Sequence, residues 1–346
     1  MSRCIQLAKN GLGTTYPNPL VGSVVVHNEK IIGEGWHYKA GQPHAEVNAI
    51  KSVSNHKDLL EASTLYVNLE PCSHFGKTPP CSDLIITSGI KKVVIGNTDP
   101  NPEVAGRGIK KLQEAGCEVI SGVLEIECSK LNKRFFTFHK KKRPYIFLKW
   151  AQTADGFIAP KKSTRRVNRP VWITNEYTRQ MVHKMRAEEM SILVGTNTVL
   201  EDNPSLTVRD WAGKNPIRIV IDKNLKILSN FSVFDQKAPT IIFAESDNNL
   251  AAQTIGSKYI NIDFSKEIAS QICNLLYQNG IQSVIVEGGS KTLQTFIDAN
   301  LWDEAHVFSG NITFGQGIMA PNFKGDLISK SLMKSDLVQY FKNQKS

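Results

Sequence analysis

Short runs of β-branched and aliphatic residues alternate with helix-compatible stretches along this chain, and the alternation begins twice. It first covers residues 23–120, and it restarts with a new apolar run after the basic segment that ends at Arg143-Pro144. Such alternation is typical of α/β layers, in which helices cover a sheet. The length of 346 residues is about twice that of an ordinary domain. We therefore predict two α/β domains, residues 1–143 and 144–346.

The pattern also predicts individual elements. The expected strands are 23–26, 64–69, 92–95, 117–120, 145–150, 191–194, 217–221, 240–243 and 283–286. The expected helices are 45–51, 106–115, 176–189 and 291–300. We expect the basic run 140–143 to be a solvated linker and the tail after about residue 330 to fray.

Composition excludes some classes of protein and leaves others open. With 41% hydrophobic and 21% charged residues, the chain is typical of a globular protein. No stretch approaches the ~18 apolar residues of a membrane span, and residues 1–15 lack the apolar core of a signal peptide. We expect a cytoplasmic protein without a membrane partner, and a homo-oligomer is compatible with the sequence. The net charge of +10 suits nucleic acid, a membrane surface or a phosphorylated small molecule, and charge alone does not choose among them.

One imidazole, two thiols and a carboxyl group occur in an informative order. Pro43-His44-Ala45-Glu46 precedes Glu70-Pro71-Cys72 and Pro79-Pro80-Cys81, with a predicted strand between them. Three protein ligands leave zinc a fourth position for a water molecule, which the metal acidifies. His-x-Glu followed by Pro-Cys and a second Cys is the signature of zinc nucleobase deaminases. We predict that His44, Cys72 and Cys81 bind a Zn²⁺ ion, that Glu46 transfers the proton, and that a helix begins at Cys72.

The spacing of the two cysteines departs from the common signature. Eight residues, Ser73 to Pro80, separate them, where two are usual. This inserted loop contains His74 and Lys77, both of which can donate to a phosphate or a carbonyl group. The loop is therefore either part of a pocket for a phosphorylated substrate or an exposed turn.

A second motif lies near residue 287. No Gly-x-Gly-x-x-Gly follows a predicted strand, so a Rossmann domain is unsupported. Instead, the strand 283–286 runs into Glu287-Gly288-Gly289-Ser290 and a helix. Small residues at a helix N-terminus form a phosphate cradle, although a tight turn without a ligand has the same pattern.

These motifs resemble, in the same order, the RibD family of bifunctional riboflavin biosynthesis enzymes. The segments that carry the resemblance are 15–22, 33–37, 44–46, 69–74, 77–81, 99–102, 148–156, 172–174, 185–187, 194–209 and 287–290. The resemblance covers nearly the whole chain. It implies a cytidine-deaminase-like three-layer α/β domain followed by a dihydrofolate-reductase-like α/β domain.

The resemblance also implies two consecutive reactions. A zinc hydroxide would deaminate 2,5-diamino-6-ribosylamino-4(3H)-pyrimidinone 5′-phosphate, and NADPH would then reduce the ribosyl group to give 5-amino-6-ribitylaminouracil 5′-phosphate. The implied contacts with the deaminase substrate are Asn18, His37, His74 and Lys77.

For the second reaction the resemblance implies two further sets of residues. The implied NADPH contacts are Gln152, Trp172, Thr198, Asp202, Lys223, Gly289, Ser290, Lys291, Thr292, Leu293, Gln294 and Thr295, with Lys223 expected at the 2′-phosphate. The implied substrate contacts are Pro170, Arg186, Leu206, Arg209 and Glu287. A basic insertion at 161–166 departs from the short connection expected before Trp172, and its simplest interpretation is a surface loop.

Two alternatives stay open. One is a zinc-dependent deaminase of a base in RNA, with the second domain as a basic RNA-binding module. The long cysteine spacing and the reductase-like motifs count against it. The other is a binding protein in which His44, Cys72 and Cys81 form a structural zinc clip. It leaves Glu46 unexplained and lacks a fourth ligand close by.

Overall fold

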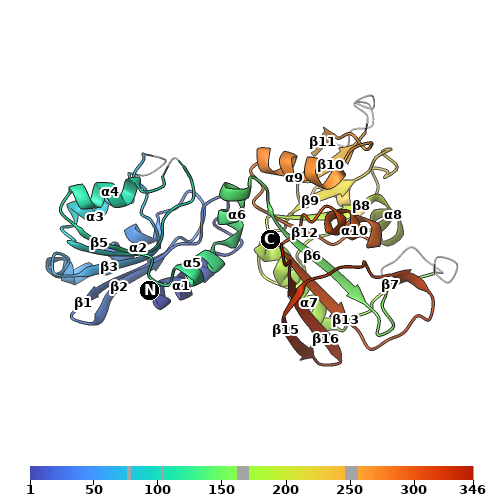
Figure 1. Ribbon diagram of the computed structural model, residues 1–346, viewed down its shortest axis with the longest axis horizontal. Helices are drawn as coiled ribbons and strands as arrows, with labels where there is room; N and C mark the ends of the chain where they lie inside the picture. The colour runs from blue at the N-terminus through green and yellow to red at the C-terminus, as the bar shows by residue number, and fades with distance from the viewer. Residues whose placement is uncertain (76–78, 103, 162–170, 246–255, 346) are drawn as a thin grey trace. The chain divides into compact units, whose positions relative to one another are not determined.

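The computed structural model describes residues 1–75, 79–102, 104–161, 171–245 and 256–345. The chain divides into two compact units, Met1–Lys142 and Arg143–Ser346 (Figure 1). Both units are α/β, as the alternation of strands and helices predicts. The nine strands and four helices predicted from periodicity are present, with ends shifted by no more than two residues.

The first unit is built on a five-stranded sheet with the order β2-β1-β3-β4-β5. Its strands are β1 (Gly22–His27), β2 (Lys30–Trp36), β3 (Thr64–Leu69), β4 (Lys92–Asn97) and β5 (Glu118–Ser121). Strand β1 pairs antiparallel with β2 and β3, whereas β3, β4 and β5 are parallel. The carboxyl ends of β3 and β4 therefore meet at one edge of the sheet.

Helices cover both faces of this sheet. They are α1 (Ser2–Ala8), α2 (Ala45–Ser52), α3 (Cys81–Thr87), α4 (Arg107–Glu114), α5 (Glu125–Leu131) and α6 (Lys133–Lys141), with the short 3-10 helices η1 (Lys9–Gly11) and η2 (Ser54–Leu59). Helices α3 and α4 lie on one side of the sheet and α1 and α5 on the other (Figure 1). The main core joins Leu65 and Ile95 of the sheet to Ile50, Ile85 and Leu112 of three helices.

The second unit contains a nine-stranded sheet with the order β11-β10-β9-β8-β12-β6-β13-β16-β15. Its strands are β6 (Tyr145–Gln152), β8 (Ser191–Gly195), β9 (Ile217–Ile221), β10 (Thr240–Ala244), β11 (Ser257–Asn261), β12 (Ser283–Val286), β13 (Glu304–Ser309), β15 (Asp326–Met333) and β16 (Asp336–Lys342). The strands from β11 to β13 are parallel, and β16 and β15 are antiparallel additions. A separate pair joins β7 (Phe157–Pro160) to β14 (Gly317–Met319).

Apolar side chains are buried on both faces of the large sheet. Along β6, Ile146 and Leu148 belong to one core, whereas Tyr145 and Phe147 belong to another. Alternation of this kind places successive side chains on opposite faces, so both faces need a cover. The covering helices are α7 (Glu176–Glu188), α8 (Thr196–Asp202), α9 (Ile268–Gln278) and α10 (Ser290–Asp298), with the 3-10 turn η4 (Ser232–Phe234).

The expectation for the tail is wrong, and the expectation for the basic run holds only in part. The tail after residue 330 does not fray, because β16 pairs with both β13 and β15 and buries Val338. In the basic run 140–143, Lys140, Lys141 and Lys142 are exposed as expected, but α6 extends to Lys141, and Arg143 forms two hydrogen bonds of 2.6 and 2.8 Å with the carboxylate of Asp303. The partners β13 and Asp303 are distant in sequence, so the local composition carried no sign of them. No helix in the described part of the chain has the length and apolar character needed to cross a membrane.

The core of the second unit permits a stability test at Phe296, whose side chain is fully buried. We expect Phe296→Ala to lower the free energy of unfolding of this unit by about 3–5 kcal/mol, because packing is lost and a cavity remains. Urea denaturation followed by tryptophan fluorescence reports on this unit, which holds four of the five tryptophans. The control Leu332→Ala, at a residue 74% exposed, should change stability by less than about 0.5 kcal/mol. Equal losses would contradict the assignment of the core.

Candidate functional site

Three potential metal ligands of the first unit come together from separate elements. His44 immediately precedes α2, Cys72 lies in the loop after β3, and Cys81 is the first residue of α3. A proline precedes each ligand in the sequence. Because proline fixes its own φ and disfavours helix in the residue before it, these prolines keep the approach to each ligand extended.

The distances among these three side chains suit zinc. Nδ1 of His44 lies 3.6 Å from Sγ of Cys72 and 3.4 Å from Sγ of Cys81. All three candidate ligand atoms lie within 4.8 Å of one another. A tetrahedral zinc ion with Zn–S near 2.3 Å and Zn–N near 2.0 Å would separate N and S by about 3.6 Å. The residues therefore fit a zinc ion with one coordination position left for another ligand.

The expected helix at Cys72 is wrong, because the helix begins at Cys81 instead. The backbone N–H of Cys81 nevertheless donates a hydrogen bond to Sγ of Cys72 (3.3 Å). Hydrogen bonds from the Cys81 thiol and from His44 lower the pKa of the Cys72 thiol, against the effect of its burial. The helix N-terminus thus favours the thiolate that a metal requires, although Cys72 is not in the helix.

Glu46 lies in the first turn of α2, beside the ligands, and is only 3% exposed. Burial, together with negative charge on Cys72, raises the pKa of Glu46 to about 7. A carboxyl group whose pKa is near neutral can both accept and release a proton during turnover. A structural zinc clip would have no use for such a group, so the arrangement favours catalysis.

Asn18 and His37 lie next to this centre. The His37 ring contacts the His44 ring edge to face, with centroids 5.3 Å apart. Nδ1 of His37 donates to the carbonyl of Pro43 (3.1 Å), so its Nε2 accepts from the amide of Asn18 (3.0 Å). Burial lowers the pKa of His37, which is therefore neutral in this network. The predicted substrate residues Asn18 and His37 are thus held in one fixed orientation.

The other two predicted contacts belong to the loop between the cysteines. His74 is exposed, and Lys77 lies outside the described residues.

Asp99, to which the sequence analysis assigned no role, follows β4 at the same edge of the sheet and is 8% exposed. Burial raises its pKa to about 6, and the charges of His74 and Cys72 also act on it. Its position in the motif 99–102 was the available signal.

Glu70 was also missed, and it braces the loop that carries Cys72. Its carboxylate is 4% exposed and accepts hydrogen bonds from four backbone N–H groups. These donors are Asp99 (3.1 Å), Gly106 (3.0 Å), Gly108 (2.9 Å) and Ile109 (3.2 Å). Three of them belong to the start of α4, where a negative charge is favourable. Glu70 thus connects the approach to Cys72 with the rest of the unit.

This brace predicts that Glu70→Gln weakens zinc binding, because the new amide places a donor among four donors. Supporting groups around a metal site typically contribute roughly 10- to 100-fold to metal affinity, and we expect a loss in that range. Competition with a chromophoric chelator measures it. The control Glu118→Gln removes an exposed carboxylate that pairs only with Lys92 among the described residues and should leave zinc affinity unchanged. An unaltered affinity in Glu70→Gln would contradict the brace.

The second unit contains a cavity of about 290 Å³. It lies at the carboxyl ends of β8, β12 and β6, which are neighbours in the sheet. Ligands of open parallel sheets bind at this edge. Eight of the predicted reductase residues line it, namely Trp172, Arg186, Thr198, Asp202, Arg209, Glu287, Gly289 and Ser290.

A charged cluster forms one wall of the cavity. The Glu287 carboxylate receives Lys149 Nζ at 2.6 Å and Arg186 Nη2 at 2.8 Å. Burial alone would raise the pKa of Glu287, but the charges of Arg186 and Lys149 lower it to about 2. Arg209 also lines the cavity, so this cluster contains three cations and one carboxylate. The cluster therefore carries net positive charge and suits an anionic ligand, and Glu201 and Asp202 also line the cavity.

His183 and the Nε atom of Arg186 are buried beside this charged cluster. His183 is buried, and burial with the charges of Arg186 and Arg209 lowers its pKa to about 4. It is therefore neutral and accepts the backbone N–H of Arg209 at Nδ1 (3.2 Å). Nε of Arg186 is buried and has no hydrogen-bond partner among the described residues.

Other predicted cofactor residues do not line the cavity. Leu293 is fully buried in the core, and Thr292 packs against Gly195 and Gly288. Thr295 donates to the carbonyl of Lys291 (2.9 Å), and Gln294 donates to Asp298 (2.7 Å). Helix α10 thus brings its first residues to the cavity and directs the later ones elsewhere.

The remaining predictions fall outside the cavity or the described residues. Leu206 is a core residue, 2% exposed. Gln152 accepts from the Trp150 indole (2.8 Å), and Lys223 forms an exposed ion pair with Glu245 (3.1 Å). Pro170 and residues 162–166 of the basic insertion are not described.

Sequence reasoning gave no role to four charged or titratable residues that line the cavity, Lys149, Arg179, His183 and Glu201. Arg179 lies over the ring of Trp172, 4.4 Å from its centroid. Lys149 was detectable, because a single lysine interrupts the apolar strand β6. His183 and Arg179 occur in a polar helix and gave no local signal.

Comparison with known proteins agrees with this division. Residues 1–97 match the family described as cytidine and deoxycytidylate deaminase zinc-binding region, and residues 144–343 match the RibD C-terminal domain. The riboflavin biosynthesis protein RibD of Aquifex aeolicus is 41% identical over 97% of this chain and 91% of its own length. RibD of Bacillus amyloliquefaciens is 41% identical over 93% of this chain and 86% of its own length.

Solved structures show the same relationship. A diaminohydroxyphosphoribosylaminopyrimidine deaminase/5-amino-6-(5-phosphoribosylamino)uracil reductase from Thermotoga maritima is 41% identical, with a TM-score of 0.89 over 99% of this chain and 97% of that one. Acinetobacter baumannii RibD is 31% identical, with a TM-score of 0.88 over the same shares.

Fold, metal centre and cavity together define a zinc-binding deaminase domain joined to a reductase domain. Such a chain is a bifunctional enzyme that acts on small molecules. The relatives make the assignment specific: the chain belongs to the RibD family of riboflavin biosynthesis proteins.

Proposed function

We propose that the first unit deaminates 2,5-diamino-6-ribosylamino-4(3H)-pyrimidinone 5′-phosphate and that the second reduces the ribosyl group of the product with NADPH. The final product is 5-amino-6-ribitylaminouracil 5′-phosphate. The observation that carries the proposal is the zinc-compatible spacing of His44, Cys72 and Cys81 beside the buried Glu46. The name of the Thermotoga maritima relative, which includes both activities, supports it.

For the deamination, His44, Cys72 and Cys81 would hold the zinc ion, which would supply an acidified water molecule for attack on C2. Glu46 takes a proton from that water and delivers it to the departing amine, which its near-neutral pKa permits. Asn18 and the neutral His37 form a preoriented polar surface beside the ligands. We assign to them, with His74 and Lys77, the binding of the pyrimidine and its phosphorylated ribose.

For the reduction, NADPH would supply the hydride, and the residues lining the cavity of the second unit would hold the nucleotide and the substrate side by side. We assign the nucleotide to the side lined by Trp172, Thr198 and Asp202 and to the start of α10, where a helix N-terminus suits a phosphate. Arg186 and Arg209 bind the anionic part of the substrate, and Glu287 holds Arg186 and Lys149 in place.

Both ligands of this enzyme are small phosphorylated molecules, and their charge agrees with a chain of net charge +10. We accordingly propose a cytoplasmic enzyme that needs neither a nucleic acid nor a membrane partner.

An assay with both substrates tests the function. The zinc-loaded chain, incubated with the diaminopyrimidine ribotide and NADPH, should release ammonia and then oxidise NADPH. Enzymatic ammonia detection and the absorbance of NADPH follow the two steps. Ammonia release without NADPH oxidation would remove the reductase half of the proposal, and failure of both steps would remove all of it.

Replacement of Glu46 separates metal binding from proton transfer. We expect Glu46→Gln to retain zinc, because the three ligands remain, and to lose roughly 10²- to 10⁴-fold in ammonia release, because the proton carrier is gone. Metal content and ammonia release are measured on the same preparation. NADPH oxidation with previously deaminated substrate is the internal control and should persist. Unchanged ammonia release would contradict the role of Glu46.

A further inference from the structure

The segment Asn203–Arg209 carries Arg209 to the cavity, yet it contains neither helix nor strand. It begins at the end of α8, where Asn203 has a left-handed backbone (φ 41°), and Leu206 has φ 57° and is 2% exposed. A segment of this kind has no ladder of its own to satisfy its backbone groups. Other side chains must therefore hold it.

Arg218 of β9 is one of these side chains, and it is fully buried. Its guanidinium donates to the carbonyls of Ser232 (2.9 Å) and Ala238 (2.6 Å), to the carboxylate of Asp235 (2.7 Å) and to Oγ1 of Thr240 (3.0 Å). We call these five residues the Arg218 cluster. It stabilises the loop 232–238, which packs beside the segment.

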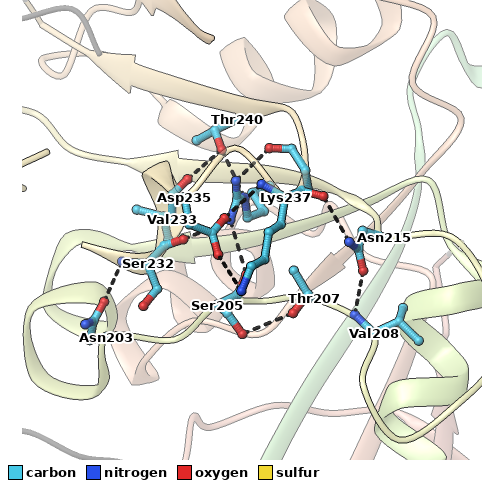
Figure 2. Close-up of polar contacts among 12 residues, drawn as sticks. Asn203, Ser205, Thr207, Val208, Asn215, Ser232, Val233, Asp235, Lys237 and Thr240 are labelled. Atoms are coloured by element: carbon cyan, nitrogen blue, oxygen red, sulfur yellow. Dashed lines mark hydrogen bonds and ion pairs between the residues drawn. The ribbon is translucent and has the colours of Figure 1, made fainter. Parts of the chain in front are cut away.

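Four hydrogen bonds, two of them through Asn215, connect the segment to this loop and to Arg218. Arg218 Nη1 donates to the carbonyl of Ser205 (3.5 Å), and the backbone N–H of Ser232 donates to Asn203 (2.7 Å). Asn215 accepts from the backbone N–H of Val208 (2.9 Å) and donates to the carbonyl of Lys237 (3.0 Å). Figure 2 shows the contacts of Asn203 with Ser232 and of Asn215 with Val208.

The segment in turn orients two of the arginines that line the cavity, Arg186 and Arg209. The guanidinium of Arg209 donates to Oγ of Ser205 and to Oγ1 of Thr207 (3.5 Å). Arg186 donates to the carbonyl of Thr207 (3.3 Å). Hydrogen bonds thus lead from Arg218, through Ser205 and Thr207, to both of these arginines.

The chemistry of arginine explains why this residue type occupies the position. A planar guanidinium has five N–H donors in a fixed arrangement and can serve several acceptors at once, whereas a lysine ammonium has three. A charge this deeply buried is unfavourable unless its donors are paired. Here the donors pair with the backbone carbonyls of Ser205, Ser232 and Ala238 and with the side chains of Asp235 and Thr240.

We propose that Arg218 is a positioning residue of the reductase reaction, which holds the Asn203–Arg209 segment so that Arg209 and Arg186 bind the anionic group of the substrate. The proposal rests on the proposed function of the cavity. Arg218 itself touches neither substrate nor cofactor and acts through Arg209.

The test uses Arg218→Lys in the full chain, with deaminated substrate and NADPH. We expect the KM for the ribosylated substrate to rise about tenfold or more, because a small displacement of Arg209 weakens its contact. The kcat and the KM for NADPH should stay within about twofold of the original. Ammonia release by the first unit verifies that the chain is intact.

Arg143→Lys is the matched control. Arg143 is also a largely buried arginine of this unit, paired with Asp303 (2.6 Å), but it has no contact with the segment. It should lower the unfolding midpoint in urea as Arg218→Lys does and leave the substrate KM within about twofold. Equal KM increases in both variants would show a general loss of stability and overturn the proposal.

A double-mutant cycle distinguishes action through Arg209 from other effects. In an Arg209→Ala background, Arg218→Lys should change KM by less than about twofold, because the group it positions is absent. A full further increase in that background would overturn the proposal. An unchanged substrate KM in Arg209→Ala alone would contradict the proposed function of the cavity. An unchanged substrate KM in Arg218→Lys alone would contradict only the positioning role of Arg218.

If Arg218→Lys does not fold, Asn215→Ala tests whether the Asn203–Arg209 segment positions Arg209. It removes only the bonds to Val208 and Lys237 at an exposed position. We expect a smaller rise of the substrate KM that disappears in the Arg209→Ala background. An unchanged KM in Asn215→Ala would then overturn the proposal.

Discussion

Parallel pairing of neighbouring strands is the constraint on which both sites depend. Because parallel strands end at the same edge of a sheet, residues far apart in sequence are brought together there. In the first unit, β3 and β4 place Cys72 and Asp99 at one edge. In the second, β6, β8 and β12 bring Lys149, Thr198 and Glu287 around one cavity. Helices that follow these strands then supply ligand atoms and backbone N–H groups.

Buried carboxylate and guanidinium groups stabilise the turns at the strand ends. These turns lack the regular hydrogen bonding of a helix or a sheet, and side chains supply partners for their backbone groups. Glu70 accepts from four backbone N–H groups beside the metal centre, and Arg218 donates to backbone carbonyls beside the cavity. A carboxylate and a guanidinium thus both stabilise a turn, because one turn presents backbone donors and the other presents backbone acceptors.

The two units tune carboxyl groups in opposite directions. Burial beside thiol ligands raises the pKa of Glu46 to about 7, which suits a group that must exchange protons. Burial would act on Glu287 in the same way, but two cations reverse the effect and lower its pKa to about 2. Glu287 therefore stays charged and serves as a fixed counter-ion. One chemical group takes two roles because its neighbours differ.

The sequence by itself determined the α/β class of both units, nine of their strands, and the order of His44, Glu46, Cys72 and Cys81 that predicts a metal site, because these depend on local periodicity and on residue types at short spacing. It did not reveal β2, β13, β15, β16, the pairing of Arg143 with Asp303, or the brace at Glu70. The pairing of β13 with β16, the Arg143–Asp303 pair and the brace depend on partners distant in the chain. Only the tertiary structure decided which residues of α10 reach the cavity and that Lys149, His183 and Arg218 belong to its surroundings. The local pattern of residues determines whether a segment forms a helix or a strand. Which side chains of two elements contact each other depends on how the elements pack in the tertiary structure.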